Sequence, residues 1–268
     1  DLLRKLESSA CLQNCAFICT SNIKHNFGEP FAWTCDALMH GVGVGFSRKG
    51  EGLITIRAPL DDQTETFIIP DSRQGWAESI NKLLNSYTGN KSKIVFDYSQ
   101  IRPAGAPLKT FSGMASGPGP LKSGHEAIAS ILDSLINQPI TSVAIVDIMN
   151  HIGAFVVAGG TRRSAQLALG NINDKEYLEM KDPDKHIDEL RSHRWNSNNS
   201  IIAKSEDDIS GIIPNLIKNG EPGIFFIDNA RHYGRMKDGY YPAGHDKCEA
   251  DNIGVNPSLH PDTLVLTD

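Results

Sequence analysis

The sequence predicts an α/β fold in which helices pack outside a mainly parallel sheet. Short apolar runs typical of strands alternate along the chain with amphipathic segments typical of helices, and neither an internal repeat nor a low-complexity linker interrupts that order. The alternation leaves open whether the sheet is flat or curled towards a barrel. With 268 residues and 40% hydrophobic content, the chain can bury one large core or two small ones.

The first clear helix and strand lie between residues 75 and 98. Apolar residues recur every three or four positions over residues 75–87, which predicts an amphipathic helix. Residues 93–98 follow a Thr-Gly-Asn turn and are β-branched and aromatic, so we expect a short buried strand. The helical pattern returns over residues 125–137.

The second half of the chain continues the alternation. Thr141 is expected to cap a helix that runs towards Gly159 and Gly160. The segments predicted after it are an apolar stretch at 166–169, a charged helix at 174–181, a strand at 199–203, a helix at 208–218 that ends at Asn219-Gly220, and a strand at 223–227. Residues 111–120, rich in Gly, Pro and Ser, are expected to form a loop.

Charge and composition exclude some classes of function. Lys plus Arg number 26 against 32 Asp plus Glu, a formal charge of −6, so no broad basic surface is expected for DNA or RNA. The longest apolar runs, such as residues 154–158, fall well short of a membrane span, and the amino terminus lacks the pattern of a secretion signal. We therefore expect a cytoplasmic protein with no membrane partner. Its five cysteines, an odd number, are expected to stay reduced.

Three cysteines, Cys11, Cys15 and Cys19, lie close together. Their spacing favours a buried strand in which they pack as small apolar residues. Zinc is disfavoured because no second Cys or His pair completes four ligands, and no metal site is expected elsewhere, since His40, His125 and His151 lack ligand spacing. A redox role for the thiols stays open.

Two Gly-rich segments allow a ligand-binding interpretation. The glycines and arginines from Gly159 to Arg163 suit either a phosphate or base ligand, or an ordinary helix end with basic residues that offset its dipole, and the sequence does not decide between them. The alternating glycines and valines at 41–50 suggest a dinucleotide loop only superficially. A strand that follows a helix is the favoured interpretation there.

The polar run at residues 193–200 also has two interpretations, a turn before a strand or a strand that lines a cavity. The first is favoured. Taken together with residues 96–107, 115–118, 147–165 and 219–223, this run resembles adenosylcobalamin-dependent (class II) ribonucleotide reductase, specifically the monomeric ribonucleoside-triphosphate reductase type. The resemblance extends in one order from about Asn14 to Pro257.

The resemblance implies a ten-stranded α/β barrel of two five-stranded halves. Residues 1–257 would form the amino-terminal half as one incomplete domain. It also implies reduction of ribonucleoside triphosphates by a thiyl radical mechanism that adenosylcobalamin initiates. A thioredoxin-like dithiol would be the reductant, and a deoxynucleoside triphosphate would be the allosteric effector.

Several residues match positions with roles in that family. Cys15 matches the first member of the reducing cysteine pair, and Asn256 and Asn14 match residues that hold the substrate ribose. Residues 41–50 would lie near one effector loop. The specificity loop between effector and substrate base would consist of Gly159, Gly160, Thr161, Arg162, Arg163 and Ser164, which favours the ligand-binding interpretation of that segment.

The sequence departs from the family at the loop expected to carry the radical cysteine. Ser258 follows Asn256-Pro257, so the radical thiol and the carboxylate after it are absent. Residues 258–268 instead resemble the start of an intein, with Pro257 the last host residue and Ser258 the nucleophile. A divergent loop is the alternative. We expect the chain to be inactive alone, and a complementary chain would carry the rest of the reductase and intein. A nucleotide-binding module without catalysis is a further alternative.

Overall fold

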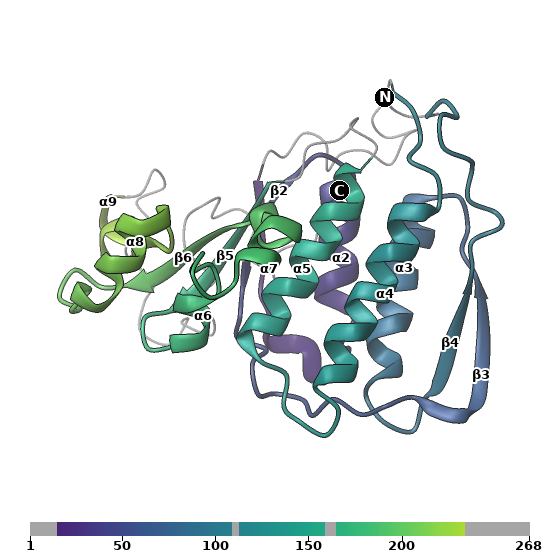
Figure 1. Cartoon of the computed structure of the whole chain (residues 1–268), viewed down its shortest axis with the longest axis horizontal. Coiled ribbons are helices and arrows are strands. Elements are labelled where there is room, and N and C mark those ends of the chain that lie inside the picture. Colours follow the sequence, from purple (N-terminus) through teal and green to yellow (C-terminus); the bar gives the residue numbers. More distant parts are fainter. Residues whose placement is uncertain (1–14, 109–112, 159–164, 234–268) are drawn as a thin grey trace.

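A five-stranded parallel sheet lies beside a layer of helices in this computed structural model, which describes residues 15–108, 113–158 and 165–233 (Figure 1). The strands are β1 (Cys15–Ile18), β2 (Gly43–Ser47), β5 (Gln166–Asn171), β6 (Asn198–Ala203) and β7 (Gly223–Phe226), in that spatial order. Every neighbouring pair is parallel, which confirms the predicted sheet.

Two helices, α2 (Glu29–Met39) and α5 (Ser142–Val157), cover one face of this sheet. The predicted cap of α5 is confirmed, because the Thr141 side chain accepts a hydrogen bond of 3.1 Å from the backbone N–H of Ala144. Most residues of α5 are buried, including Asp147 and Asn150, since the helix lies between the sheet and other helices. Its buried polar side chains therefore need partners inside the protein.

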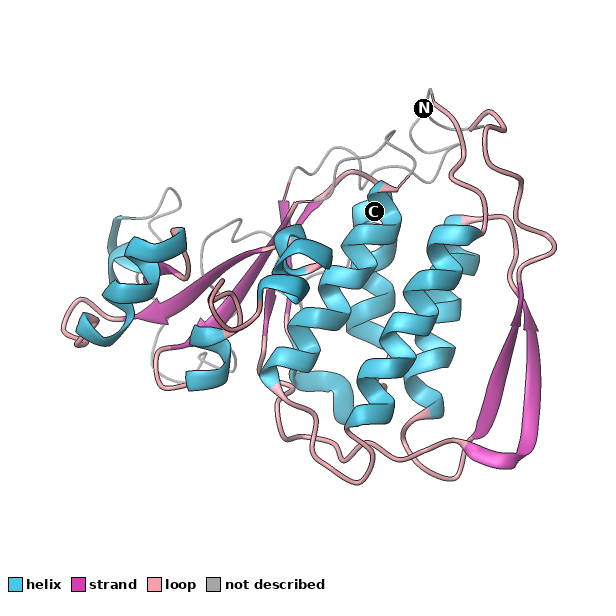
Figure 2. Cartoon of the chain, in the orientation of Figure 1, coloured by secondary structure: helices cyan, strands magenta, loops and turns pink. Residues whose placement is uncertain are grey.

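The chain between β2 and α5 forms a separate layer. It contains β3 (Leu60–Ile68), α3 (Arg73–Ser86), β4 (Ser92–Asp97) and α4 (Gly119–Ser134). Helices α3 and α4 pack against α2 and α5, and β3 and β4 form a two-stranded parallel ribbon beside α3. Figure 2 shows the four helices standing between the five-stranded sheet and this ribbon.

Short helices connect the later strands. Between β5 and β6 lie α6 (Lys175–Glu179), α7 (Ile187–Ser192) and the 3-10 turn η3 (Arg194–Asn196). Between β6 and β7 lie η4 (Ser210–Ile212) and α8 (Ile213–Asn219), and α9 (Ile227–Tyr233) follows β7. The 3-10 turn η2 (Thr20–Lys24) follows β1. None of the helices in the described part of the chain is long and apolar enough to cross a membrane.

The two faces of the sheet differ in their side chains. Alternate strand residues, such as Ala16, Val44, Phe46, Ala168 and Ile201, join the main core under the helices, and we call this side the helix face. The strand register places the intervening residues on the other side, the Cys15 face, which carries Cys15, Phe17, Gly43, Gly45, Leu167, Leu169, Asn198, Ser200, Ile202, Gly223 and Phe225.

Some elements differ from the prediction. Helix α4 begins at Gly119 rather than near residue 125, because Pro120 is favourable in a first turn. The helix expected over 208–218 is divided into η4 and α8, and Pro214 stands at the start of α8. It ends as expected at Gly220, whose φ of 82° is left-handed. Strand β3 was not predicted.

Candidate functional site

The amino ends of the five strands meet along one edge of the sheet, which we call the amino edge. Cys15 begins β1 and is paired with Gly43, the first residue of β2. Asn198 begins β6 and Gly223 begins β7. Helix α5 ends at Val157, and β5 begins at this same edge with Gln166. Segment 159–164 therefore lies in sequence between the end of α5 and the amino edge.

Cys15 is the most accessible thiol in the described part of the chain. Its residue is half-buried on the Cys15 face, whereas Cys19 and Cys35 are buried. The Cys19 thiol lies 3.0 Å from Ser21 Oγ and 3.5 Å from Ser47 Oγ, in the turn after β1. The predicted strand is present as β1, but it contains only Cys15, which is half-buried rather than buried; Cys19 lies beyond it and Cys11 lies outside the described residues. A half-buried thiol at the start of β1 can be reached from the amino edge.

Two polar residues of β6 share the Cys15 face. Asn198 is exposed and Ser200 is half-buried. Ser197, before the strand, and Asn199, between the two residues, are buried. The turn η3 before β6 agrees with the favoured interpretation of residues 193–200. The cavity-lining interpretation stays a prediction, although β6 presents polar side chains on the Cys15 face. The Cβ of a residue larger than glycine at Gly223 would lie 2.8 Å from Ser200 Oγ, so glycine leaves that hydroxyl accessible.

A buried ion pair supports the amino edge from the helix side. Arg194 donates to both carboxylate oxygens of Asp147, from Nε and Nη2, each at 2.8 Å. His193 Nε2 lies 3.0 Å from Asp147 Oδ1, and the His193 ring stacks on His151 at 4.2 Å between centroids. Burial opposes ionisation of Asp147, but hydrogen bonds and charges from His193 and Arg194 outweigh it and lower the pKa of this carboxyl.

A second buried ion pair continues the network towards β7. Lys181 Nζ lies 2.6 Å from Glu221 Oε2 and also donates to the carbonyl of Ser197. The same Glu221 carboxylate accepts the backbone N–H of Asn199 at 3.2 Å. Burial lowers the pKa of Lys181, although Glu221 partly offsets that effect. Asp147, on α5, and Glu221, just before β7, are therefore both tied to the segment that begins β6.

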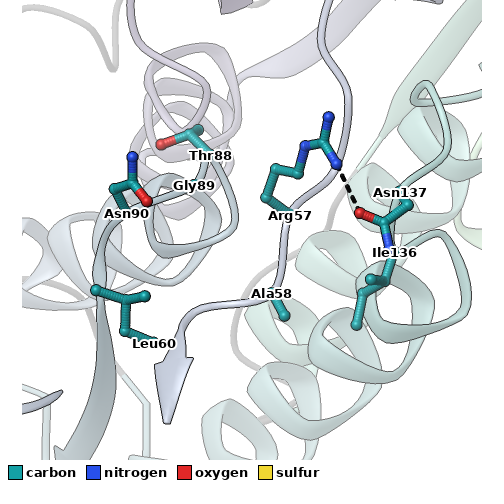
Figure 3. A pocket seen from close by; sticks show the side chains of 8 residues that line it. All are labelled: Arg57, Ala58, Leu60, Thr88, Gly89, Asn90, Ile136 and Asn137. Atoms are coloured by element: carbon teal, nitrogen blue, oxygen red, sulfur yellow. Dashed lines mark hydrogen bonds between the residues drawn. The ribbon is translucent and has the colours of Figure 1, made fainter. Parts of the chain in front are cut away.

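The structure also contains a pocket that the sequence did not indicate, beside helices α3 and α4 (Figure 3). It measures about 480 Å³ and lies where α3 and α4 end, near the start of β3. Arg57 donates to Asn137 Oδ1 at 2.6 Å across it, and the remaining lining residues are Ala58, Leu60, Thr88, Gly89, Asn90 and Ile136. None of the residues predicted for function lines this pocket.

The other residues predicted for function lie outside the described residues. These are Asn14, Gly159 to Ser164, Asn256, Pro257 and Ser258. Their roles stay predictions, and so does the intein-like start at 258–268. Within residues 15–108, 113–158 and 165–233, the structure contains no group of three or more His, Cys, Asp or Glu side chains that could hold a metal ion.

Comparisons with known proteins identify the family. The adenosylcobalamin-dependent ribonucleoside-triphosphate reductase of Euglena gracilis is 42% identical over 96% of this chain, and the probable enzyme of Dictyostelium discoideum is 40% identical over 93%. The chain is a class II ribonucleotide reductase homologue. It spans about a third of these relatives, 35% of the Euglena protein and 34% of the Dictyostelium protein.

The fold agrees with this relationship. A crystal structure of a B12-dependent (class II) ribonucleotide reductase superposes with a TM-score of 0.67 and 32% identity, over 80% of this chain and 34% of that one. The family profile described as the insertion domain of B12-dependent ribonucleotide reductase matches residues 52–132. That range corresponds to the layer between β2 and α5, so this class II reductase homologue carries the insertion as β3, α3, β4 and most of α4.

Proposed function

We propose that this chain forms part of the catalytic barrel of an adenosylcobalamin-dependent ribonucleoside-triphosphate reductase. The observation that carries the proposal is the position of Cys15, whose half-buried thiol begins β1 at the amino edge of a parallel sheet. Homology to about a third of the length of the class II enzymes supports the same activity. The reaction would take place in the cytoplasm and would convert ribonucleoside triphosphates to deoxyribonucleotides.

In this proposal Cys15 supplies one of two thiols that reduce the 2′ carbon of the ribose. The two thiols together give two electrons and two protons, the 2′ hydroxyl leaves as water, and a disulfide forms between the two sulfurs. A thioredoxin-like dithiol then reduces that disulfide by thiol–disulfide exchange. Adenosylcobalamin, when bound, supplies the radical that starts the reaction. An accessible thiol beside the uncharged residues Gly43 and Gly45 of the Cys15 face fits this chemistry.

The remaining roles in the proposal belong to residues outside the described part. Asn14 and Asn256 would hold the substrate sugar. Arg162 and Arg163, between α5 and β5, would contact a deoxynucleoside triphosphate effector. Because Ser258 follows Pro257, the chain has no thiol at the position of the radical cysteine, and we expect no turnover from these 268 residues alone.

A second candidate function rests on Ser258 and the residues after it. If they begin an intein, the chain is the amino-terminal part of a splicing precursor. Mixing it with a complementary chain that carries the rest of the intein and reductase should give a ligated product, which mass spectrometry would detect. No ligated mass, with both chains folded, would reject this function.

The reductase proposal is tested with Cys15→Ser in the full-length protein, assayed for deoxynucleotide formation with adenosylcobalamin, a ribonucleoside triphosphate and a dithiol. Turnover with the dithiol should fall to background, because a serine hydroxyl cannot form the disulfide. Cys35→Ala is the control, since Cys35 lies on helix α2 and is buried in the core rather than on the Cys15 face. Near-normal turnover of Cys15→Ser would refute the assignment.

A further inference from the structure

Asn198 and Ser200 form a polar pair on the Cys15 face of β6, close to the amino edge. We propose that these two side chains bind the sugar hydroxyls of an uncharged ribonucleoside, and that this nucleoside is the adenosyl group of the cofactor rather than the substrate that is reduced. The inference rests on the proposed reductase function and adds a binding site to it.

The backbone of β6 is held rigidly enough to fix where these side chains point. The carbonyl of Ser197 accepts from Lys181, the N–H of Asn199 donates to Glu221, and the carbonyl of Ser200 accepts from Tyr177 Oη at 3.0 Å. The Asn199 side chain turns inward, where Nδ2 lies 3.3 Å from Met180 Sδ. Because strand side chains alternate, this anchoring directs Asn198 and Ser200 to the opposite face.

The hydrogen-bonding groups of the pair remain available. Among the described residues, neither the Asn198 amide nor the Ser200 hydroxyl is in a hydrogen bond, and Gly223 leaves space beside Ser200 Oγ. An amide and a hydroxyl each offer a donor and an acceptor, which suits a vicinal diol whose oxygens both donate and accept. A ribose with free 2′ and 3′ hydroxyls has this diol.

The lack of charge at this position favours a nucleoside over a triphosphate. Around Asn198 and Ser200, the described residues of the Cys15 face are Gly43, Gly45, Leu167, Leu169 and Gly223, all of them uncharged. Triphosphate sites usually contain Lys, Arg or a cluster of backbone N–H groups. Lys181 is nearby but is buried and paired with Glu221.

The distance to Cys15 separates this ribose from the reacting one. Strand β6 is the fourth in the order and β1 the first, and three strand spacings correspond to roughly 14 Å. A ribose reduced by the Cys15 thiol must contact that sulfur, so it cannot also lie on Asn198. A second nucleoside on the same face of the sheet, with its own diol, satisfies both positions.

The test is an equilibrium titration of the full-length protein with adenosylcobalamin, in which the absorbance of the corrin ring reports binding. Asn198→Ala and Ser200→Ala should each weaken adenosylcobalamin binding by about three- to tenfold, the effect of losing one or two hydrogen bonds. Binding of methylcobalamin, which carries a methyl group in place of the adenosyl group, should not change. Asn173→Ala is the matched control, because Asn173 is an exposed asparagine beyond the carboxyl end of β5.

The outcomes separate the two proposals. Weaker binding of a ribonucleoside triphosphate, with unchanged adenosylcobalamin affinity, would keep a ribose site but contradict its assignment to the cofactor. Unchanged affinity for both ligands, or equal losses for adenosylcobalamin and methylcobalamin, would overturn the inference while leaving the reductase proposal intact. Failure of the wild-type protein to bind any cobalamin would contradict both. Unchanged melting temperatures of the variants would exclude a folding effect.

Discussion

Removing the guanidinium of Arg194 should destabilise the protein strongly. In Arg194→Met, Asp147 loses two hydrogen bonds of 2.8 Å, and the carbonyl of Met180 loses a third at 2.5 Å. The Asp147 side chain is only 10% exposed, so water cannot replace these partners. His193 still faces the Asp147 carboxylate, but removing one partner of a buried ion pair costs about 3–5 kcal/mol. This is a large fraction of the roughly 5–15 kcal/mol typical of a folded protein.

Urea unfolding at pH 7 measures this loss. With a denaturant slope of about 3 kcal/mol per molar, which suits a chain of this size, the midpoint should fall by about 1–2 M. The matched control is Lys185→Met, because Lys185 pairs with Glu179 at 2.7 Å but is 49% exposed. Exposed pairs contribute about 1 kcal/mol or less, so the midpoint of the control should change little.

A double variant distinguishes a buried charge from lost packing. Asp147→Leu together with Arg194→Met replaces both charges by apolar groups, and it should recover much of the lost stability. A double variant as unstable as the sum of its single variants would refute the reasoning. So would a loss below about 1 kcal/mol in Arg194→Met alone, which would mean that water solvates the Asp147 carboxylate.

Acid should abolish the difference between wild type and Arg194→Met. The pKa of Asp147 is lower in the folded state than in the unfolded chain, where it is about 3.9. The stabilisation from ionised Asp147 is therefore fully present above that unfolded pKa and is lost as the pH falls through the lower folded pKa. Unfolding curves that keep the same separation below that folded pKa would contradict the assigned ionisation.

Two further groups of predictions follow from burial. Burial lowers the pKa of His125 to about 3 and that of His151 to about 4, so both rings should stay neutral in NMR titrations down to about pH 5, and stability should decrease as the pH falls below about 6.5; a ring that titrates near 6.5 would contradict this. Gly170→Ala should cost at least about 1–3 kcal/mol in urea unfolding, because its Cβ would lie 2.1 Å from the buried ring of Tyr177, whereas Gly211→Ala, with no atom within 4 Å, should be neutral; equal effects would reject the steric argument.

Elements with a one-sided apolar pattern could be predicted from the sequence. Helix α3 was expected over 75–87 and is found at Arg73–Ser86, because its apolar residues face the core. It begins two residues early since Ser72 caps it by accepting from the N–H of Gly75 at 3.0 Å. Strand β3 could not be predicted in this way. Its middle residues are exposed and mostly polar or acidic, so pairing with β4, rather than burial, makes them a strand.

Contacts between distant residues also escaped prediction. Asp147 and Arg194 are 47 residues apart, and no periodicity or spacing in the sequence links the helix of the first to the turn of the second. Cys15 was assigned by resemblance, and its accessibility could not be known from spacing. The register of five strands was needed to put Cys15, Asn198 and Ser200 on one face, because a shift of one residue would reverse every side chain.

The edge of the sheet to which we assign the function is unusual for an α/β fold. Ligands commonly bind at the carboxyl ends of parallel strands. Here the Cys15 face carries an apolar cluster towards the strand centres and carboxyl ends, where Phe17 and Leu169 are buried against Ile227 of α9. A polar ligand there would have to displace packed side chains. At the amino edge, glycines and small polar residues leave accessible hydrogen-bonding groups, so both the proposed reducing thiol and the proposed ribose site belong at that edge. A nucleotide cross-linked to residues beyond the carboxyl ends, such as Asn173, would contradict this conclusion.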